Sequence, residues 1–100
     1  MKITRQFATD CGFKQSETSH NIYEMSRSCD EYIELLFEKE EFVRFRMNDV
    51  NREVEIYNNA DDVDVDYFLR MFLMIYGVPT FEPFCSAMKK MYHIVQEYPS

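Results

Sequence analysis

The residues with the greatest chemical potential in this chain are its carboxylates. The chain holds 18 Asp and Glu against 11 Lys and Arg, a net charge of −7. Fourteen of the acids and five of the bases fall between Glu24 and Asp66, so this segment carries −9 and the rest +2. Direct binding to nucleic acid is disfavoured because phosphates attract Lys and Arg, and an anionic membrane is disfavoured for the same reason. The natural electrostatic partner is a basic protein surface.

Alternating aspartates from Asp62 to Asp66 match the opening of a calcium-binding loop. The match fails at the two positions that make such a loop work, because Tyr67 stands where a turn-forming Gly is required and Leu73 where a bidentate Glu is required. These acids are typical instead of a helix start, where one side chain caps free amides and the others oppose the positive end of the dipole.

Sulfur and imidazole groups offer a second set of candidates. They are Cys11, Cys29, Cys85, His20 and His93. None forms a CxxC or HxxxH pair, and no local motif supplies a nucleophile with an oxyanion hole. The sequence therefore predicts no metal site, no cofactor and no catalytic residue. An odd number of cysteines also favours a reducing compartment.

Four short runs of alternating apolar and polar residues dominate the first half of the chain. The alternation predicts half-buried strands over residues 20–27, 31–38, 41–47 and 52–58. Short turn-forming connections between them predict neighbouring antiparallel strands, and hence a meander.

The two faces of this meander differ in chemistry. The apolar positions Val43, Phe45, Met47, Val54 and Ile56 are expected to face the core. The outward positions carry acids, Glu34, Glu38, Glu53 and Glu55, around two bases, Arg44 and Arg46. Pairing between these charges across strands would fix the register more than it would add stability.

Helical spacing replaces the alternation in the second half. It predicts helices over residues 64–76 and 81–97, the first ending at Gly77 and the second capped by Thr80. Phe68, Leu69 and Phe72 are expected to join the core. Residues 1–19 are the least regular, with Phe7 on a short helical turn and Phe13 as an anchor.

Together these elements predict an α+β fold in one domain, 1–100, with a four-stranded antiparallel meander covered on one face by two C-terminal helices. The subdivision is a loosely packed N-terminal arm (1–19), a sheet (20–58) and two helices (61–98). Residues 1–7 lack the apolar core of a secretory signal, and the longest apolar run, 71–76, is too short to span a bilayer. We therefore expect a cytoplasmic protein.

For function, the sequence favours a small acidic, non-enzymatic interaction protein. Carboxylates spread over strands and turns can imitate a phosphate array and block a basic, nucleic-acid-binding surface of a target protein. Small size, acidity and the lack of catalytic motifs are shared, in style only, with phage-encoded inhibitors such as anti-CRISPR proteins, although no motif of such a family is matched. The residues predicted to bind the partner are Glu34, Glu38, Glu53, Glu55, Asp61, Asp62, Asp64 and Asp66, with Arg44 and Arg46 as counter-contacts.

Two alternatives stand beside this hypothesis. Ordinary solubility charge explains a net charge of this size in a small domain. A structural or assembly subunit would instead form a homo-oligomer, through the last helix or through Tyr23, Tyr32, Leu36 and Tyr57 on the open sheet face.

Overall fold

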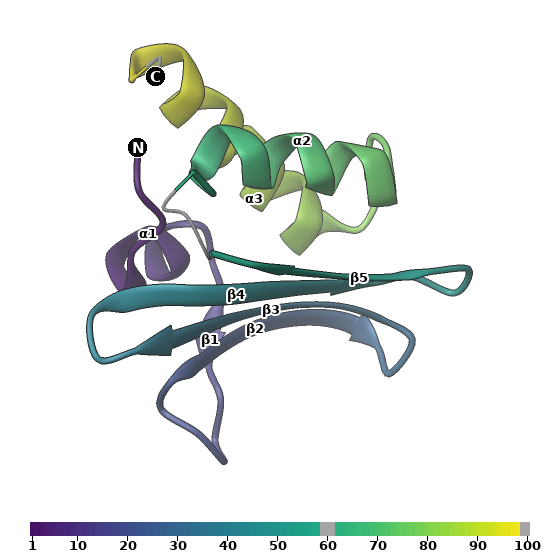
Figure 1. The fold of residues 1–100 in the computed structure, drawn as a ribbon. Coiled ribbons are helices and arrows are strands. Elements are labelled where there is room, and N and C mark those ends of the chain that lie inside the picture. The colour runs from purple at the N-terminus through teal and green to yellow at the C-terminus, as the bar shows by residue number, and fades with distance from the viewer. Residues whose placement is uncertain (59–61, 99–100) are drawn as a thin grey trace.

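A computed structural model describes residues 1–58 and 62–98 (Figure 1). The elements in chain order are α1 (Arg5–Asp10), β1 (Lys14–Gln15), β2 (Ile22–Ser28), β3 (Glu31–Glu38), β4 (Glu41–Asn48), β5 (Glu53–Tyr57), α2 (Val65–Tyr76) and α3 (Glu82–Glu97). The strands form one antiparallel sheet in the order β1-β2-β3-β4-β5. The predicted α+β meander is confirmed, and β1 adds a fifth, two-residue strand at the edge of β2.

The β3–β4 pairing contains a bulge that the alternating pattern did not reveal. Leu36 lies opposite Arg44, whereas Phe37 lies opposite Phe42, so Val43 is an extra residue on β4. The extra residue shifts the alternation, and Phe42 becomes buried while Val43 stays half-exposed. The prediction that Val43 belongs to the core was therefore wrong, because a bulge changes which side chains face inward.

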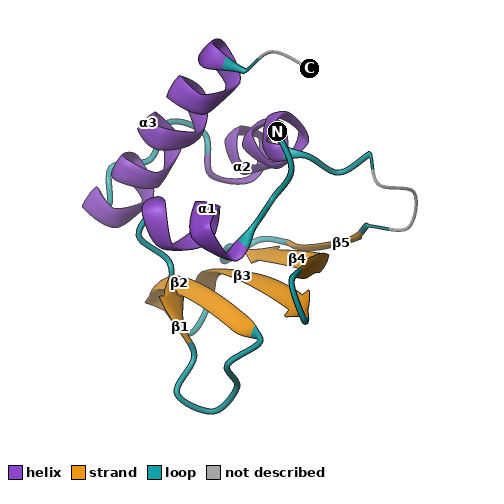
Figure 2. Ribbon diagram, turned by 90° about the vertical axis from the view of Figure 1, so that its left-hand side faces the viewer, coloured by secondary structure: helices purple, strands orange, loops and turns teal. Residues whose placement is uncertain are grey.

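All three helices lie on one face of the sheet (Figures 1 and 2). Phe45 and Phe68 meet at the centre of this core, with ring centroids 5.0 Å apart in an edge-to-face arrangement. Leu69 and Phe72 are also buried, as predicted. Val54 and Ile56 pack against the core but stay partly exposed because β5 is an edge strand.

The N-terminal segment is an integral part of the fold and not the loose arm that was predicted. Phe7 and Phe13 are buried and both pack against Phe68. Thr4 caps α1 by accepting a hydrogen bond from the Phe7 amide. Arg5 then donates from Nε to the Lys39 carbonyl and from Nη1 to the His20 carbonyl, both at 2.8 Å. One guanidinium thus joins α1 to the β3–β4 turn and the β1–β2 loop.

Local signals at the helix ends were partly correct. Asp64 caps α2 and accepts from the Tyr67 amide at 2.9 Å. Gly77 follows α2 with φ of 64°, a backbone conformation that favours glycine. Thr80 does not cap α3, because the N-cap position belongs to Phe81, which makes no side-chain capping bond. Pro83 in the first turn removes one amide that a cap would otherwise have to satisfy.

Candidate protein-interaction surface

The sheet face opposite the helices is uncovered, and we call it the open face (Figure 2). Strand register places its side chains in three rows that cross the sheet: Ile22, Leu36, Arg44 and Tyr57; Lys14, Glu24, Glu34, Arg46 and Glu55; and Ser26, Tyr32, Asn48 and Glu53. The predicted outward placement of Glu34, Glu53, Glu55, Arg44 and Arg46 is confirmed. The placement of Tyr23 on the open face was wrong, because Tyr23 lies opposite buried Leu35 and packs against Phe37 on the helix side. The charges occupy the middle row and the β4–β5 side, with apolar and aromatic groups around them.

Arginines of β4 neutralise the carboxylates of β5. Arg44 Nη1 lies 3.1 Å from Glu55 Oε1, and Arg46 Nη2 lies 3.6 Å from Glu55 Oε2. Arg46 Nε also lies 3.7 Å from Glu53 Oε1. The Tyr57 hydroxyl donates a further hydrogen bond to Glu55. This hydrogen bond and the two arginines hold the pKa of Glu55 below its ordinary value, against the opposing effect of desolvation.

The same network acts on Arg46. Desolvation acts to lower its pKa, but a hydrogen bond with Tyr32 and the charges of Glu34 and Glu55 outweigh this and raise it. The arginine therefore stays charged and paired. A partner that approached the open face would have to compete with these contacts, so this face presents less free negative charge than its sequence suggests.

A second group of carboxylates lies at one end of the molecule, and we call it the acid end. It comprises Glu38, Glu40 and Glu41 around the β3–β4 turn, with Asp62 and Asp64 before α2. Four of them are exposed and have no ion pair within the described residues: Glu38, Glu40, Glu41 and Asp62. Asp64 is half-buried because it caps α2. The two stretches come together in space although more than twenty residues separate them in the chain.

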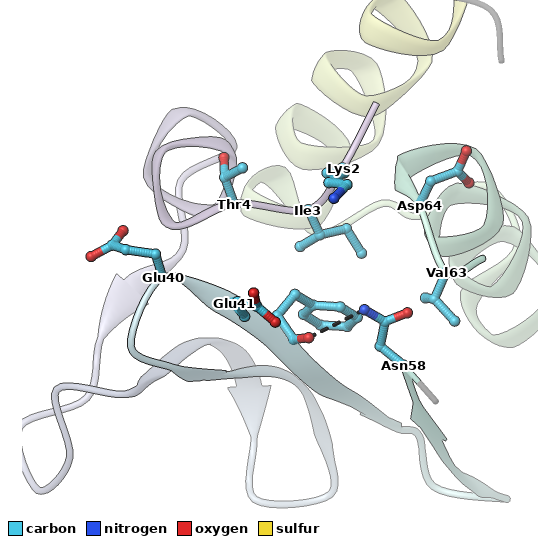
Figure 3. A pocket seen from close by; sticks show the side chains of 9 residues that line it. Lys2, Ile3, Thr4, Glu40, Glu41, Asn58, Val63 and Asp64 are labelled. Atoms are coloured by element: carbon cyan, nitrogen blue, oxygen red, sulfur yellow. Dashed lines mark hydrogen bonds between the residues drawn. The ribbon is translucent and has the colours of Figure 1, made fainter. Parts of the chain in front are cut away.

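A shallow cavity of about 220 Å³ separates the β3–β4 turn from the segment before α2 (Figure 3). Its walls include the apolar side chains of Ile3, Phe42 and Val63. Figure 3 shows Glu40 and Asp64 projecting away from each other on opposite sides of it. The Asn58 side chain also lines the cavity and donates from Nδ2 to the Phe42 carbonyl at 3.3 Å. Three of the acid-end carboxylates, Glu40, Glu41 and Asp64, thus border the cavity from its two sides and do not converge on a single point.

The structure divides nine of the ten residues predicted to bind a partner into three groups. Glu53, Glu55, Arg44 and Arg46 form the ion-pair network, and Glu34 lies beside Arg46 in the register. Glu38, Asp62 and Asp64 belong to the acid end, whereas Asp61 lies outside the described residues. Asp66 pairs with Arg70 at 3.0 Å. Partner binding by these residues stays a prediction.

Two carboxylates at the acid end were not among the predicted binding residues. Glu40 and Glu41 were assigned only to a connection and a strand start, yet both are exposed and line the cavity wall. A run of three acids in four residues, interrupted only by Lys39, was the available signal. Strand register places Glu41 opposite Glu38, so the residue that faces it across the two strands is another acid and not a base.

Among the cysteines, Cys11 is buried, Cys85 is half-buried and Cys29 is exposed. Burial, followed by the charge of Asp10, raises the pKa of the Cys11 thiol to about 12, so it is a poor nucleophile at neutral pH. Within residues 1–58 and 62–98, no group of three or more His, Cys, Asp or Glu side chains is placed to hold a metal ion. Over the same residues, no helix has the length and apolar character needed to cross a bilayer.

Comparison with known proteins gives no assignment for this surface. No protein-family model, no curated protein and no solved structure matches this chain.

Proposed function

We propose that this chain is a small, non-enzymatic interaction protein whose acid end occupies a basic, nucleic-acid-binding surface of a target protein. Its mode of action would be that of an inhibitor, in the style of phage-encoded anti-defence proteins, in the cytosol of a bacterial or host cell. The observation that carries the proposal is the contrast in pairing. Four exposed acid-end carboxylates have no ion pair within the described residues, whereas the acids of β5 are paired.

Unpaired carboxylates suit this role for an electrostatic reason. A charge that is already paired contributes little field at a distance, whereas several unpaired charges of one sign attract a cationic partner and speed its association. Lys2, Arg5 and Lys39 are bases near this end, and against Glu38, Glu40, Glu41, Asp62 and Asp64 they leave it with an excess of negative charge. Arg5 also holds the backbone of the β3–β4 turn in place, through the Lys39 carbonyl.

The proposal is tested by capture of partners from bacterial lysate at low and at high salt. The wild-type chain is compared with an acid-end variant that carries Glu38→Gln, Glu40→Gln, Glu41→Gln and Asp62→Asn. A matched control removes four acids elsewhere that have no ion pair among residues 1–58 and 62–98, Glu17→Gln, Glu24→Gln, Asp30→Asn and Glu82→Gln, so that both variants have the same net charge. Captured proteins are then challenged with duplex DNA and with RNA.

We expect wild type and control to retain a basic protein that high salt releases and that added nucleic acid displaces. The acid-end variant should lose it. Capture that is indifferent to salt, or equal for the acid-end variant and its control, would exclude the acid end as the binding surface.

A second candidate function is a homo-oligomeric assembly subunit. The observation in its favour is the apolar and aromatic content of the open face, where Tyr57 is 51% exposed and Leu36 and Tyr32 are half-exposed. Light scattering across a concentration series separates the two candidates. A stable dimer that Leu36→Glu dissociates favours the assembly subunit, and a monomer at all concentrations favours the first proposal.

A further inference from the structure

The β3–β4 turn has a backbone conformation that its own residues do not favour. Lys39 has a φ of 56°, and it is the only residue other than glycine with a positive φ among residues 1–58 and 62–98. Left-handed backbone of this kind suits glycine, because a Cβ atom crowds the neighbouring carbonyl. A two-residue connection between antiparallel strands usually has glycine, asparagine or aspartate where φ is positive. Lysine has no such preference, so the local sequence does not explain the turn.

The charges on either side of the turn do not favour it either. Glu38 and Glu41 are Cα partners, so two carboxylates lie directly opposite each other where the strands meet the turn. Like charges in this arrangement are destabilising. Both side chains are exposed, and neither forms an ion pair within the described residues. A contact from another element is therefore important for keeping this turn ordered.

A guanidinium from α1, which lies beside this end of the sheet, makes such a contact (Figure 1). Arg5 Nε donates to the Lys39 carbonyl at 2.8 Å, so the bond acts on the residue whose backbone is left-handed. Arg5 Nη1 donates to the His20 carbonyl at 2.8 Å, and Nη2 donates to Asn21 Oδ1 at 3.0 Å. Because the guanidinium is planar and its donors are rigidly arranged, three partners in different directions fix its orientation.

Aromatic rings and the core fix the same guanidinium from the other side. Arg5 Cζ lies 5.3 Å from the ring centroid of Phe37 and 5.8 Å from that of Tyr23. These two rings are in edge-to-face contact, and Phe37 is buried. Arg5 begins α1 directly after the cap Thr4, and Phe7 of the same helix is buried. The turn is thus bound to a group whose position is set by the core.

We propose that Arg5 is the positioning residue of the acid end: its bond to the Lys39 carbonyl holds the β3–β4 turn in the left-handed conformation and so keeps the turn carboxylates in fixed positions for a basic partner. Arg5 does not itself touch the partner. A fixed arrangement binds more tightly than a mobile one, because less conformational freedom is lost on binding. The consequence for binding rests on the proposed function, whereas the effect on the turn does not depend on it.

The test uses the difference between glycine and alanine at position 39. Lys39→Gly and Lys39→Ala remove the same charge, but only glycine adopts a positive φ without cost. Each is combined with Arg5→Lys, which keeps the positive charge and removes the rigid fork of donors. The bonds of Arg5 to His20 and Asn21 are lost equally in both backgrounds, so they cancel in the comparison.

We expect Arg5→Lys to loosen residues 38–41 in the Lys39→Ala background, where NMR order parameters of these amides should fall from about 0.85 toward about 0.6. In the Lys39→Gly background the fall should be much smaller, because glycine keeps the positive φ without help. Calorimetry at low salt with a capped tetralysine peptide should show a roughly threefold loss of affinity in the first background and less than about 1.5-fold in the second. The acid-end variant is the control that should not bind this peptide.

Equal changes in the two backgrounds, or order parameters that Arg5→Lys leaves unchanged, would overturn the proposal. If Arg5→Lys fails to fold, the wild-type chain still decides, because the Arg5 Nε proton should exchange with water at least roughly tenfold more slowly than in free arginine. Exchange at the free rate would overturn the proposal. A wild-type chain that binds tetralysine no better than the acid-end variant would contradict the proposed function and leave Arg5 a structural residue without a role in binding.

Discussion

The open face and the acid end both concentrate carboxylates, but they hold them in different ways. On the open face, strand register places Arg44 and Arg46 beside Glu55, and the opposite charges form ion pairs. At the acid end, the β3–β4 turn and the segment before α2 bring acids together, and Arg5 binds the Lys39 carbonyl there without forming an ion pair with any of them among the described residues. The register between β4 and β5 thus sets arginines beside acids, whereas the register at the β3–β4 turn sets Glu38 opposite Glu41.

The largest expected effect is on binding at the acid end. Neutralising Glu38, Glu40, Glu41 and Asp62 should weaken capture of a basic partner by about 1.4–2.8 kcal/mol, or roughly tenfold to a hundredfold at low salt. The same change should alter the free energy of unfolding by no more than about 0.5 kcal/mol per site, because these side chains are exposed. Calorimetric binding and urea unfolding measure the two quantities separately. A large loss of stability would mean that these acids have a structural role.

A smaller effect separates two neighbours within the acid end. Asp64→Ala removes the cap of α2 and should cost about 0.5–2 kcal/mol of stability. Asp62→Ala, two residues earlier, should change the free energy of unfolding little because Asp62 is exposed and lies outside the cap. Urea unfolding of both variants checks this, and equal stabilities would contradict the capping role.

The open face should show coupling between its charges. Arg44→Met and Glu55→Gln each break the same ion pair, so the double variant should lose less stability than the two single variants combined. A double-mutant cycle in urea measures this coupling, and it should shrink in high salt. Strict additivity would show that the pair in the structure contributes nothing.

The smallest effect is a dependence on pH. The folded-state pKa of Glu55 lies below its ordinary value of 4.5, so its contribution to stability is present above that value and is lost as pH falls through the folded pKa. Wild type should therefore exceed Glu55→Gln in stability at neutral pH, and the gap should close in acid. Thermal unfolding of both proteins from pH 7 down to about pH 3 follows the gap. A gap that does not change with pH would contradict the network.

Most of the fold could be predicted from the sequence because its signals are local. The two-residue alternation located four of the five strands, and helical spacing located α2 and α3. The bulge at Val43 escaped because it is a property of the paired strands and leaves no mark on one strand. The packing of Phe7 and Phe13 against Phe68 depends on a contact between segments far apart in the chain.

The candidate surface was harder to predict for a related reason. Counting the acids on a predicted strand face gives the charge of that face, but it does not show which of these acids form ion pairs. Whether Glu55 is neutralised depends on the register between β4 and β5. Whether Glu40 and Asp64 line the same cavity depends on the distance in space between the β3–β4 turn and the start of α2.

The difference between the two surfaces can be measured directly from local potentials. Paramagnetic relaxation of backbone amides by a cationic and by an anionic nitroxide probe, compared residue by residue, reports the field at each position without any binding partner. We predict strong enrichment of the cationic probe at residues 38–41 and 62–64 and only weak enrichment over Arg44, Arg46 and Glu55. Equal enrichment at both surfaces, or a stronger one over the open face, would contradict the account.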